Sequence, residues 1–340
     1  MNNSLTVAVL GSTGYVGLEL VKILNKHPHV KINFLGCDNL ISANSNLSKQ
    51  EIKKLDLPNF QLNDDFNPNF SDLVFLALPH GVSNKFVKNF FGKLKIIDLS
   101  ADFRLDQVST YKKNYEDHHS CSHLLSKFIY GLPELNKIDI KNNDNIAVPG
   151  CYPTSILLPL IPLLRKKLIK TDNIIIDSKS GYSGAGKKFD TNNILYNDDL
   201  NFYNYNTNNH RHICEIRQEL EKRTDEKVNF SFNPHILPIY RGMMSTIYID
   251  LKNNKQNSIK ECLVEFSKKN VFINFIKDNE RSDFFKIQNT NNCNLKLFNH
   301  YDNSKIIIVS IIDNLLKGAA GQAIQSMNIM YNFREDAGLI

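Results

Sequence analysis

The chain has 340 residues, of which 42% are hydrophobic and 22% are charged, and its formal net charge is +6. A chain of this length can bury a large core and is more often built as two domains than as one. Lys and Arg are spread along it without a basic stripe, which argues against nucleic-acid binding, and no apolar run is long enough to span a bilayer. The mild excess of positive charge favours an anionic substrate.

The N-terminus and the cysteines indicate a cytoplasmic protein. No basic segment followed by an apolar core lies near Met1, so we expect no signal peptide. The six cysteines are scattered along the chain and do not form a disulfide framework, so we expect reduced thiols.

A buried parallel strand is predicted for residues 5–10 and a helix with an apolar face for residues 18–24. The turn between them carries glycines at G-x-x-G-x-x-G spacing, which permits a tight turn, close approach of a pyrophosphate and close packing of helix on strand. Strand, glycine turn and helix in this order predict a dinucleotide site formed by Gly11, Ser12, Thr13, Gly14, Tyr15, Val16 and Gly17.

The second strand, predicted for residues 31–36, does not decide between NAD and NADP. An acidic residue at its end would hold the ribose 2′-hydroxyl of NAD. Asp38 lies near that end but slightly late, and no Arg is present there to bind a 2′-phosphate.

Two further buried strands are predicted for residues 73–78 and 95–99. Pro79 begins the loop after the first of them, at the strand end where ligands bind in open α/β sheets. Arg104 follows the second and can bind a carboxylate or phosphate with two parallel hydrogen bonds. A structural ion pair of Arg104 with Asp98 or Asp102 is an equally good interpretation.

Metal-ligand residue types crowd one short polar segment, at His118, His119, Cys121 and His123. Their spacing fits no established ligand pattern, and adjacent histidines point in different directions. We therefore predict no metal site.

Near the middle of the chain, Cys151 is predicted to lie at or just before a helix N-terminus. Pro149 and Gly150 interrupt the preceding segment, and Pro153 suits the first turn of a helix. At such a position the N–H groups and the helix dipole lower the pKa of a thiol and can also hold an oxyanion. The alternative for a single Cys is a small buried apolar residue.

The loop after the next predicted strand, residues 173–178, is rich in small residues and lysine. Ser183 and Gly184 would let a ligand approach the backbone, and Lys187 suits an anion, although an ordinary solvent loop has the same composition. Residues 190–209 are predicted to be irregular.

His210 and His212 precede a predicted helix at residues 213–220, where a histidine can serve as the acid/base partner of a reactive Cys. Strands are predicted for residues 239–249, which include Arg241, and for residues 305–312. Strands with few intervening helices favour a mixed or antiparallel sheet. The segment after Asp313, which includes Asn314, is predicted to open a long helix that continues over residues 322–330.

These motifs together resemble the N-acetyl-gamma-glutamyl-phosphate reductases over nearly the whole chain. The resemblance rests on the glycine turn and on residues 77–81, 98–104, 130–136, 149–154, 180–186, 210–212 and 313–318.

The resemblance implies an α/β protein of the semialdehyde-dehydrogenase type with two domains. Residues 1–149, completed by the C-terminal helix 318–340, would form a Rossmann domain with a doubly wound parallel sheet that binds NADP(H). Residues 150–317 would form an α+β catalytic and oligomerisation domain with a mixed sheet. Cys151 would be the nucleophile and His210 the acid/base, with His212 as its competitor. The glycine turn would bind the cofactor together with Pro79, Ser183, Gly184 and Asn314.

The implied reaction is the NADPH-dependent reduction of N-acetyl-L-glutamyl 5-phosphate to N-acetyl-L-glutamate 5-semialdehyde and phosphate, through a Cys thioester, in arginine biosynthesis. Arg104, Lys187 and Arg241 are the candidates for substrate binding. The family implies a homodimer or homotetramer. Two alternatives are a related acyl-phosphate or semialdehyde reductase with another substrate, and a non-catalytic NADP-sensing protein.

Overall fold

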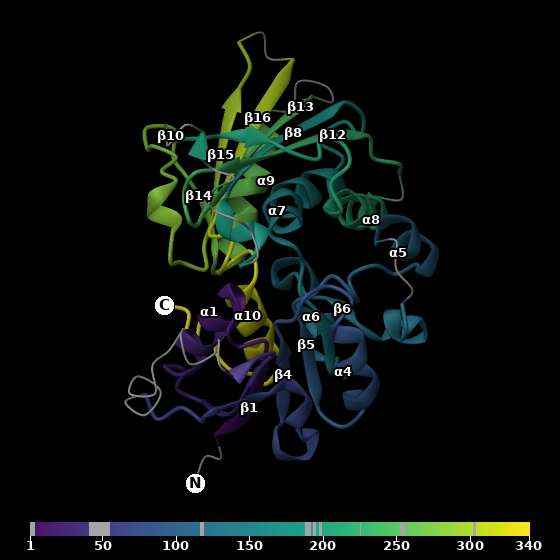
Figure 1. Ribbon diagram of the computed structural model, residues 1–340. Helices are drawn as coiled ribbons and strands as arrows, with labels where there is room; N and C mark the ends of the chain where they lie inside the picture. Colours follow the sequence, from purple (N-terminus) through teal and green to yellow (C-terminus); the bar gives the residue numbers. More distant parts are fainter. Residues whose placement is uncertain are drawn as a thin grey trace. The chain divides into compact units, whose positions relative to one another are not determined.

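The computed structural model describes residues 4–40, 55–115, 119–187, 192, 195–196, 199–224, 226–251, 256–301 and 304–340. The chain divides into two compact units, Met1–Pro149 with Ala319–Ile340, and Gly150–Gly318. Each unit is built on its own seven-stranded sheet (Figure 1). Within the described ranges no helix is long and apolar enough to cross a membrane.

The sheet of the first unit is parallel throughout, with strand order β3-β2-β1-β4-β5-β7-β6. Its central strands are short and almost fully buried, as expected when helices cover both faces. The order reverses between β1 and β4, which is where open α/β sheets bind ligands. The strands are β1 Leu5–Leu10, β2 Val30–Cys37, β3 Phe60–Leu62, β4 Leu73–Leu76, β5 Lys95–Asp98, β6 Ile129–Tyr130 and β7 Asn145–Ala147.

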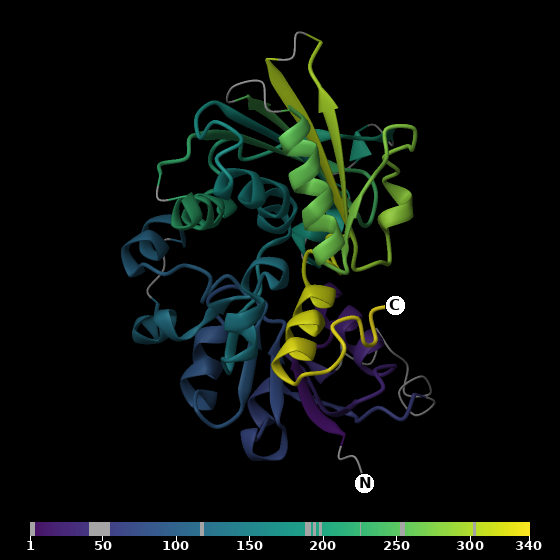
Figure 2. The ribbon, with the colours of Figure 1, turned by 180° about the vertical axis from the view of Figure 1, so that it is seen from behind.

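The C-terminal helix of the chain completes this unit. All residues of α10 are buried, and the helix packs against α1 and α6 (Figure 2). Its polar side chains are hydrogen-bonded inside the unit, since Asn328 Oδ1 accepts from His27 Nε2 at 3.0 Å and the Gln325 amide donates to Glu134 at 2.9 Å. The helices are α1 Tyr15–Leu24, α4 Ser83–Phe90, α5 Val108–Tyr115, α6 Pro133–Lys141 and α10 Ala320–Met330, with the 3₁₀ turns η1 Asn63–Asp65, η2 Pro68–Phe70 and η3 Ser122–Lys127.

The sheet of the second unit is mixed, with strand order β11-β12-β8-β13-β16-β15-β14. The pairs β8–β12 and β14–β15 are parallel and the other pairs are antiparallel. The strands are β8 Ile174–Gly181, β11 Tyr203–Asn204, β12 Phe230–Leu237, β13 Met243–Asp250, β14 Ile273–Phe275, β15 Cys293–Asn299 and β16 Lys305–Ile312; β9 Leu195–Tyr196 and β10 Asp199–Leu200 form a separate pair.

Helices α7 Cys151–Arg165 and α9 Gln256–Lys269 pack on one face of this sheet, and α8 His212–Thr224 packs on α7 (Figure 1). The short turns η4 Tyr182–Ala185 and η6 Phe285–Ile287 complete the unit. Buried serines lie where α7 meets the sheet. Ser245 of β13 is 2.7 Å from Ser155 of α7 and 2.7 Å from Ser178 of β8. Small hydroxyl side chains let the helix approach the sheet closely, and each hydroxyl has a partner, as a buried polar group requires.

The predicted parallel and mixed sheets are both confirmed, while several element limits were wrong. β13 begins at Met243, because Gly242 adopts a positive φ of 110° and bends the chain before the strand. β8 continues to Gly181, through residues predicted as loop, since they pair with β13 and β12. The segment 190–209 contains the short strand β11, and α10 begins only at Ala320, after a turn closed by the Gly318 N–H and the Asp313 carbonyl at 3.0 Å.

Candidate active site

Cys151 is the first residue of α7 and is partly exposed. Gly150 before it is extended, with φ −67° and ψ 157°. The N–H and Oγ1 of Thr154 both donate to the Gly150 carbonyl at 2.9 Å, and Pro153 has no N–H. The thiol therefore stands at a helix start, where the dipole and the backbone donors favour negative charge.

Two residues from distant parts of the second unit enclose this turn. Glu215, in the first turn of α8, is fully buried and accepts the Gly150 N–H at 2.9 Å. Gly318 lies so close that a Cβ on it would come within 2.7 Å of the Cys151 Cβ. We did not predict either contact. In the sequence, Glu215 is only an acidic residue three positions after His212, and Gly318 is only a glycine at a turn. Neither feature identifies the residue that it contacts.

His210 precedes α8, and its ring lies edge-on to that of Tyr152, with centroids 5.3 Å apart. Its Nδ1 accepts the His212 N–H at 3.1 Å. Burial, together with the charge of Arg211, lowers the pKa of His210 to about 4, so the imidazole is neutral near pH 7. The His212 ring is 4.8 Å from His210 and 6.0 Å from Tyr152. Both histidines thus surround the residue that follows Cys151, and His210 is the nearer.

Arg241, a candidate for substrate binding, is engaged inside the protein. Its Nε and NH2 donate to the two carboxylate oxygens of Asp313 at 2.7 and 3.1 Å, and NH1 donates to Asn289 at 2.9 Å. Asp313 is fully buried. Any substrate anion at this point would share the guanidinium with a buried carboxylate.

Ser183, Gly184 and Asn314, predicted to bind the cofactor, come together at the carboxyl end of β8. The Asn314 amide donates to Ser183 Oγ at 2.9 Å and accepts the Gly242 N–H at 2.7 Å. A Cβ on Gly184 would lie 3.7 Å from the same amide. Lys187 is exposed at the end of this loop.

The predicted dinucleotide turn in the first unit is built as a close-fitting cradle. Gly11 has φ +72°, and a Cβ on it would lie 2.3 Å from the Ala77 carbonyl oxygen. A Cβ on Gly17 would lie 2.2 Å from the Gly11 carbonyl oxygen. Ser12 is buried, and its hydroxyl donates to the Gly36 carbonyl at 2.8 Å, so its side chain supports the turn from inside. The partly exposed members of the turn are Gly11, Thr13, Gly14, Tyr15 and Val16.

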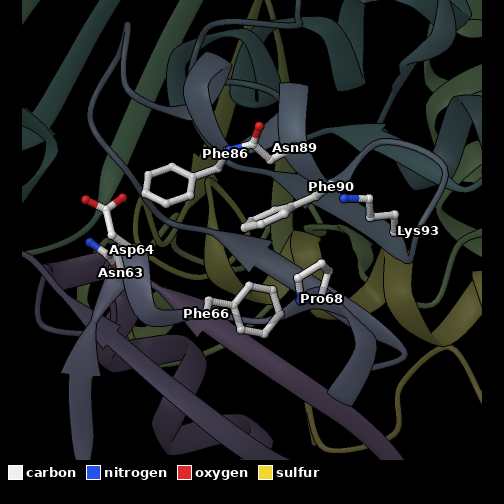
Figure 3. A pocket seen from close by; sticks show the side chains of 8 residues that line it. All are labelled: Asn63, Asp64, Phe66, Pro68, Phe86, Asn89, Phe90 and Lys93. Atoms are coloured by element: carbon white, nitrogen blue, oxygen red, sulfur yellow. The ribbon is translucent and has the colours of Figure 1, made fainter.

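Asn63, which sequence reasoning missed, joins this turn to the end of β2. Its side-chain oxygen accepts the Gly11 N–H at 3.0 Å, and its amide donates to Asp38 at 2.7 Å. Asn63 also lines a cavity of about 160 Å³ between the η1–η2 segment and α4 (Figure 3). The rings of three phenylalanines converge on this cavity, and its lining residues are Asn63, Asp64, Phe66, Pro68, Phe86, Asn89, Phe90 and Lys93.

The loops after β4 and β5 are locked to each other. His80, next to Pro79, places Nδ1 2.7 Å from a carboxylate oxygen of the fully buried Asp102. Arg104 is also buried, and its NH2 donates to the Leu99 carbonyl at 2.9 Å. The predicted residues Pro79 and Arg104 therefore belong to the first unit together with the glycine turn, whereas Cys151 and His210 belong to the second.

His119 and Cys121, two of the four candidate metal ligands, are engaged in hydrogen bonds with other groups of the protein. His119 is buried, with Nε2 2.8 Å from the Asp102 carbonyl oxygen and Nδ1 accepting the Cys121 N–H at 3.1 Å. Cys121 is bonded to the Asn84 carbonyl at 3.4 Å. His118 lies outside the described residues. Among the residues that are described, no group of three His, Cys, Asp or Glu side chains is arranged to hold a metal ion.

Two family models match the chain. Residues 6–143 match the semialdehyde dehydrogenase NAD-binding domain, and residues 151–314 match the semialdehyde dehydrogenase dimerisation domain. Solved structures of 14–18% identity have the same fold. Aspartate semialdehyde dehydrogenase II from Vibrio cholerae superposes with a TM-score of 0.73 over 97% of this chain and 99% of that one, at 16% identity.

Curated relatives of much higher identity span the full length. N-acetyl-gamma-glutamyl-phosphate reductase from Ehrlichia canis is 42% identical over 100% of this chain and 98% of its own length. The enzyme of the same name from Caldicellulosiruptor bescii is 43% identical over 98% of this chain and 97% of its own. This chain, with Cys151 at a helix start, His210 and His212 near it and the glycine turn at residues 11–17, therefore belongs to the N-acetyl-gamma-glutamyl-phosphate reductase family of semialdehyde dehydrogenases.

Proposed function

We propose that this chain reduces N-acetyl-L-glutamyl 5-phosphate to N-acetyl-L-glutamate 5-semialdehyde and phosphate with NADPH, as a step of arginine biosynthesis. The substrate is assigned from the membership of this chain in the family. The single structural observation that supports the chemistry is the position of Cys151 at the start of α7, in a turn anchored by Glu215 and next to the His210–Tyr152 pair.

Cys151 is the proposed nucleophile. Its sulfur attacks the acyl carbon, the C–O bond to phosphate breaks, and a thioester remains on the enzyme. The cofactor, when bound, supplies the hydride that reduces this thioester. Each addition to the acyl carbon places a negative charge on its oxygen, and backbone N–H groups of the first turn of α7 stabilise this oxyanion. After the reduction the C–S bond breaks to give the aldehyde and a thiolate. His210 is the proposed acid/base group and His212 the alternative. The one proton consumed overall ends on the released phosphate.

The first unit fits a dinucleotide. A Cβ on Gly11 or Gly17 would collide with backbone, so the glycines keep the turn flat enough for a pyrophosphate to approach the start of α1. The exposed turn residues, Pro79, and Ser183, Gly184 and Asn314 are the groups we propose to contact the cofactor. NADP(H) is proposed over NAD(H) from the family, and a comparison of the two binding constants tests the preference.

The substrate-binding residue is proposed among Arg104, Lys187 and Arg241. Two of these have guanidinium groups already bonded inside the protein, to Leu99 and to Asp313. Lys187 is exposed and lies on the loop that carries Ser183. A substrate-concentration series with single variants separates them, because loss of a substrate contact raises KM.

A homodimer or homotetramer is proposed through the open face of the second sheet. Ile175, Tyr248, Ile307 and Phe298 are neighbours in one row across four strands. Ile175, Tyr248 and Phe298 are 45%, 36% and 41% exposed. Such an apolar row on a sheet face in a dimerisation domain is suited to a second copy of the same face.

A reducing compartment, the cytoplasm, is proposed from the thiols. No disulfide bond joins any of the six cysteines, all of which lie in the described residues, and the proposed mechanism needs Cys151 as a reduced thiol or thiolate.

The test is phosphate-dependent reduction of NADP with N-acetyl-glutamate semialdehyde, which is the reverse reaction and avoids the unstable acyl phosphate. We expect activity in the wild type, a loss of several orders of magnitude in Cys151→Ser, and near-normal activity in the control Cys262→Ser. A folded, NADP-binding wild type without activity would contradict the substrate and favour a related reductase or a sensor. Activity that survives in Cys151→Ser would contradict the nucleophile.

A further inference from the structure

Tyr205 lies beside the proposed catalytic histidine, in a segment for which the sequence predicts no structure. Its hydroxyl is 3.4 Å from His210 Nε2 and 3.2 Å from the Tyr152 hydroxyl. Its ring stands edge-on to the imidazole, with centroids 5.5 Å apart and an interplanar angle of 74°. The backbone of Tyr205 is fixed as well, since its N–H donates to the Pro234 carbonyl at 3.0 Å next to β11.

The direction of each hydrogen bond around His210 follows from one backbone contact. The His212 N–H can only donate, so His210 Nδ1 is an acceptor. A neutral imidazole then carries its proton on Nε2, and that N–H donates to the Tyr205 oxygen. Tyr205 in turn donates to Tyr152, and Tyr152 donates to the His235 carbonyl at 3.4 Å.

Tyr205 and Tyr152 remain protonated and act as donors in this series of hydrogen bonds. Burial raises the pKa of Tyr205 to about 12 and also raises the pKa of Tyr152 well above its usual value. The charge of Cys151 contributes to both increases, so both hydroxyls lie within the electrostatic reach of the proposed nucleophile. A third aromatic ring, Phe232, is 5.7 Å from the imidazole and completes its packing.

We propose that Tyr205 is a positioning residue that holds His210 in one tautomer and one ring orientation, with the proton on Nε2. This inference rests on the proposed role of His210 and deepens it. In this tautomer both ring nitrogens are assigned before the substrate binds: Nδ1 accepts from the His212 N–H, and the Nε2–H held by Tyr205 is the proton that His210 can redirect to the substrate oxygen that becomes an oxyanion. The titratable or charged groups that contact this ring or act on it are Arg211, His212, Tyr152 and Tyr205.

The first test compares Tyr205→Phe with the matched control Tyr203→Phe, which removes a hydroxyl two residues away in the same segment. Tyr205→Phe keeps the edge-on ring and removes the hydroxyl, which accepts the Nε2 proton and donates to Tyr152. We expect kcat to fall about tenfold or more, with KM for both substrates changed by less than about threefold. Tyr203→Phe should stay within about twofold of the wild type. A Tyr205→Phe enzyme with wild-type kcat would overturn the proposal.

A double-mutant cycle with His210→Asn shows whether Tyr205 acts through His210. Removing the tyrosine hydroxyl should have no further effect once the imidazole is absent, whereas a merely structural role would cost the same in both backgrounds. If His210→Asn itself keeps normal activity, the proposed role of His210 fails. If His210→Asn is inactive and Tyr205→Phe is normal, only the present inference fails.

A spectroscopic measurement covers variants that are too inactive for kinetics. In ¹⁵N-histidine-labelled enzyme, two-bond ¹H–¹⁵N correlations report the tautomer of each ring, and the His210 signal is the one missing from His210→Asn. We expect the Nε2–H form in the wild type and a mixture of tautomers in Tyr205→Phe. An unchanged Nε2–H signal in Tyr205→Phe would refute the inference.

Discussion

Gly318→Ala is the most informative substitution for the nucleophile turn. The added methyl group would lie 2.5 Å from the Asn314 carbonyl oxygen, 2.7 Å from the Cys151 Cβ and 2.9 Å from the Asn314 Cα. None of these atoms is the end of a flexible side chain, so backbone must move. Overpacking of this kind costs about 1–3 kcal/mol of stability.

The same movement should also impair catalysis. One of the atoms displaced is the Cβ that carries the proposed attacking sulfur, and a misplacement of about 1 Å costs about 100-fold in rate. We therefore expect kcat to fall between about 10- and 100-fold, with affinity for NADP unchanged. Steady-state kinetics give kcat, and the rate of Cys151 alkylation by iodoacetamide reports on the thiol directly.

Gly92→Ala is the control, because it strains the chain without approaching the site. Gly92 has φ +76° and no atom within 4 Å of an added Cβ, so alanine there should lower stability by about 1 kcal/mol and leave kcat unchanged. If Gly318→Ala keeps wild-type kcat and alkylation rate, the close contact between Gly318 and Cys151 does not shape the nucleophile, and the reasoning is wrong.

Three other predictions test different parts of the molecule. Asp313→Ala should lower the free energy of unfolding in urea by about 3–5 kcal/mol, because it leaves Arg241 buried without its carboxylate; a loss below about 1 kcal/mol would contradict this. Burial and the charge of Asp102 raise the pKa of Asp98 to about 7, above its value of about 3.9 in the unfolded chain. The stabilising contribution of this carboxyl group is therefore complete below about pH 3.9 and is lost as the pH rises towards 7. In thermal unfolding, the stability of Asp98→Asn relative to the wild type should be higher at pH 8 than at pH 5. Ile307→Lys should shift the protein to a smaller species in size-exclusion chromatography with light scattering, and an unchanged mass would place the oligomer interface elsewhere.

Local sequence signals predicted the elements whose physics is local. Strand, glycine turn and helix at the N-terminus follow from apolar patterning and from positions such as Gly11 that require a positive φ. Likewise Gly150 and Pro153 predict a helix start at Cys151, because each limits the backbone within a few residues of itself. The limits of β8 were wrong for the opposite reason. Its last residues are small and polar, and only pairing with β13 makes them a strand.

The partners of the candidate site could not be predicted in this way. Glu215 is 65 residues from the N–H that it accepts, and Tyr205 is 53 residues from the hydroxyl to which it donates. Nothing in a tyrosine- and asparagine-rich segment distinguishes Tyr205 from Tyr203, since both are compatible with a loop. The difference arises only when β11 pairs with β12 and brings Tyr205 to the imidazole.

Glu215 narrows the possible oxyanion donors in the turn. The Gly150 N–H is committed to this carboxylate, Pro153 has none, and the Thr154 N–H returns to the Gly150 carbonyl. We therefore expect the N–H groups of Cys151 and Tyr152 to be the ones that hold an oxyanion, and one of these groups belongs to the nucleophile itself. A buried carboxylate that is hydrogen-bonded to the residue before the thiol would oppose ionisation of the thiol. The same hydrogen bond fixes the Gly150 N–H and so stabilises the turn at the start of α7. Glu215→Gln keeps an acceptor oxygen and removes the negative charge, so it should preserve the turn and make the thiol easier to ionise. We expect the pH profile of Cys151 alkylation to shift to lower pH in this variant. A shift to higher pH would contradict the idea that the Glu215 charge opposes ionisation of the thiol.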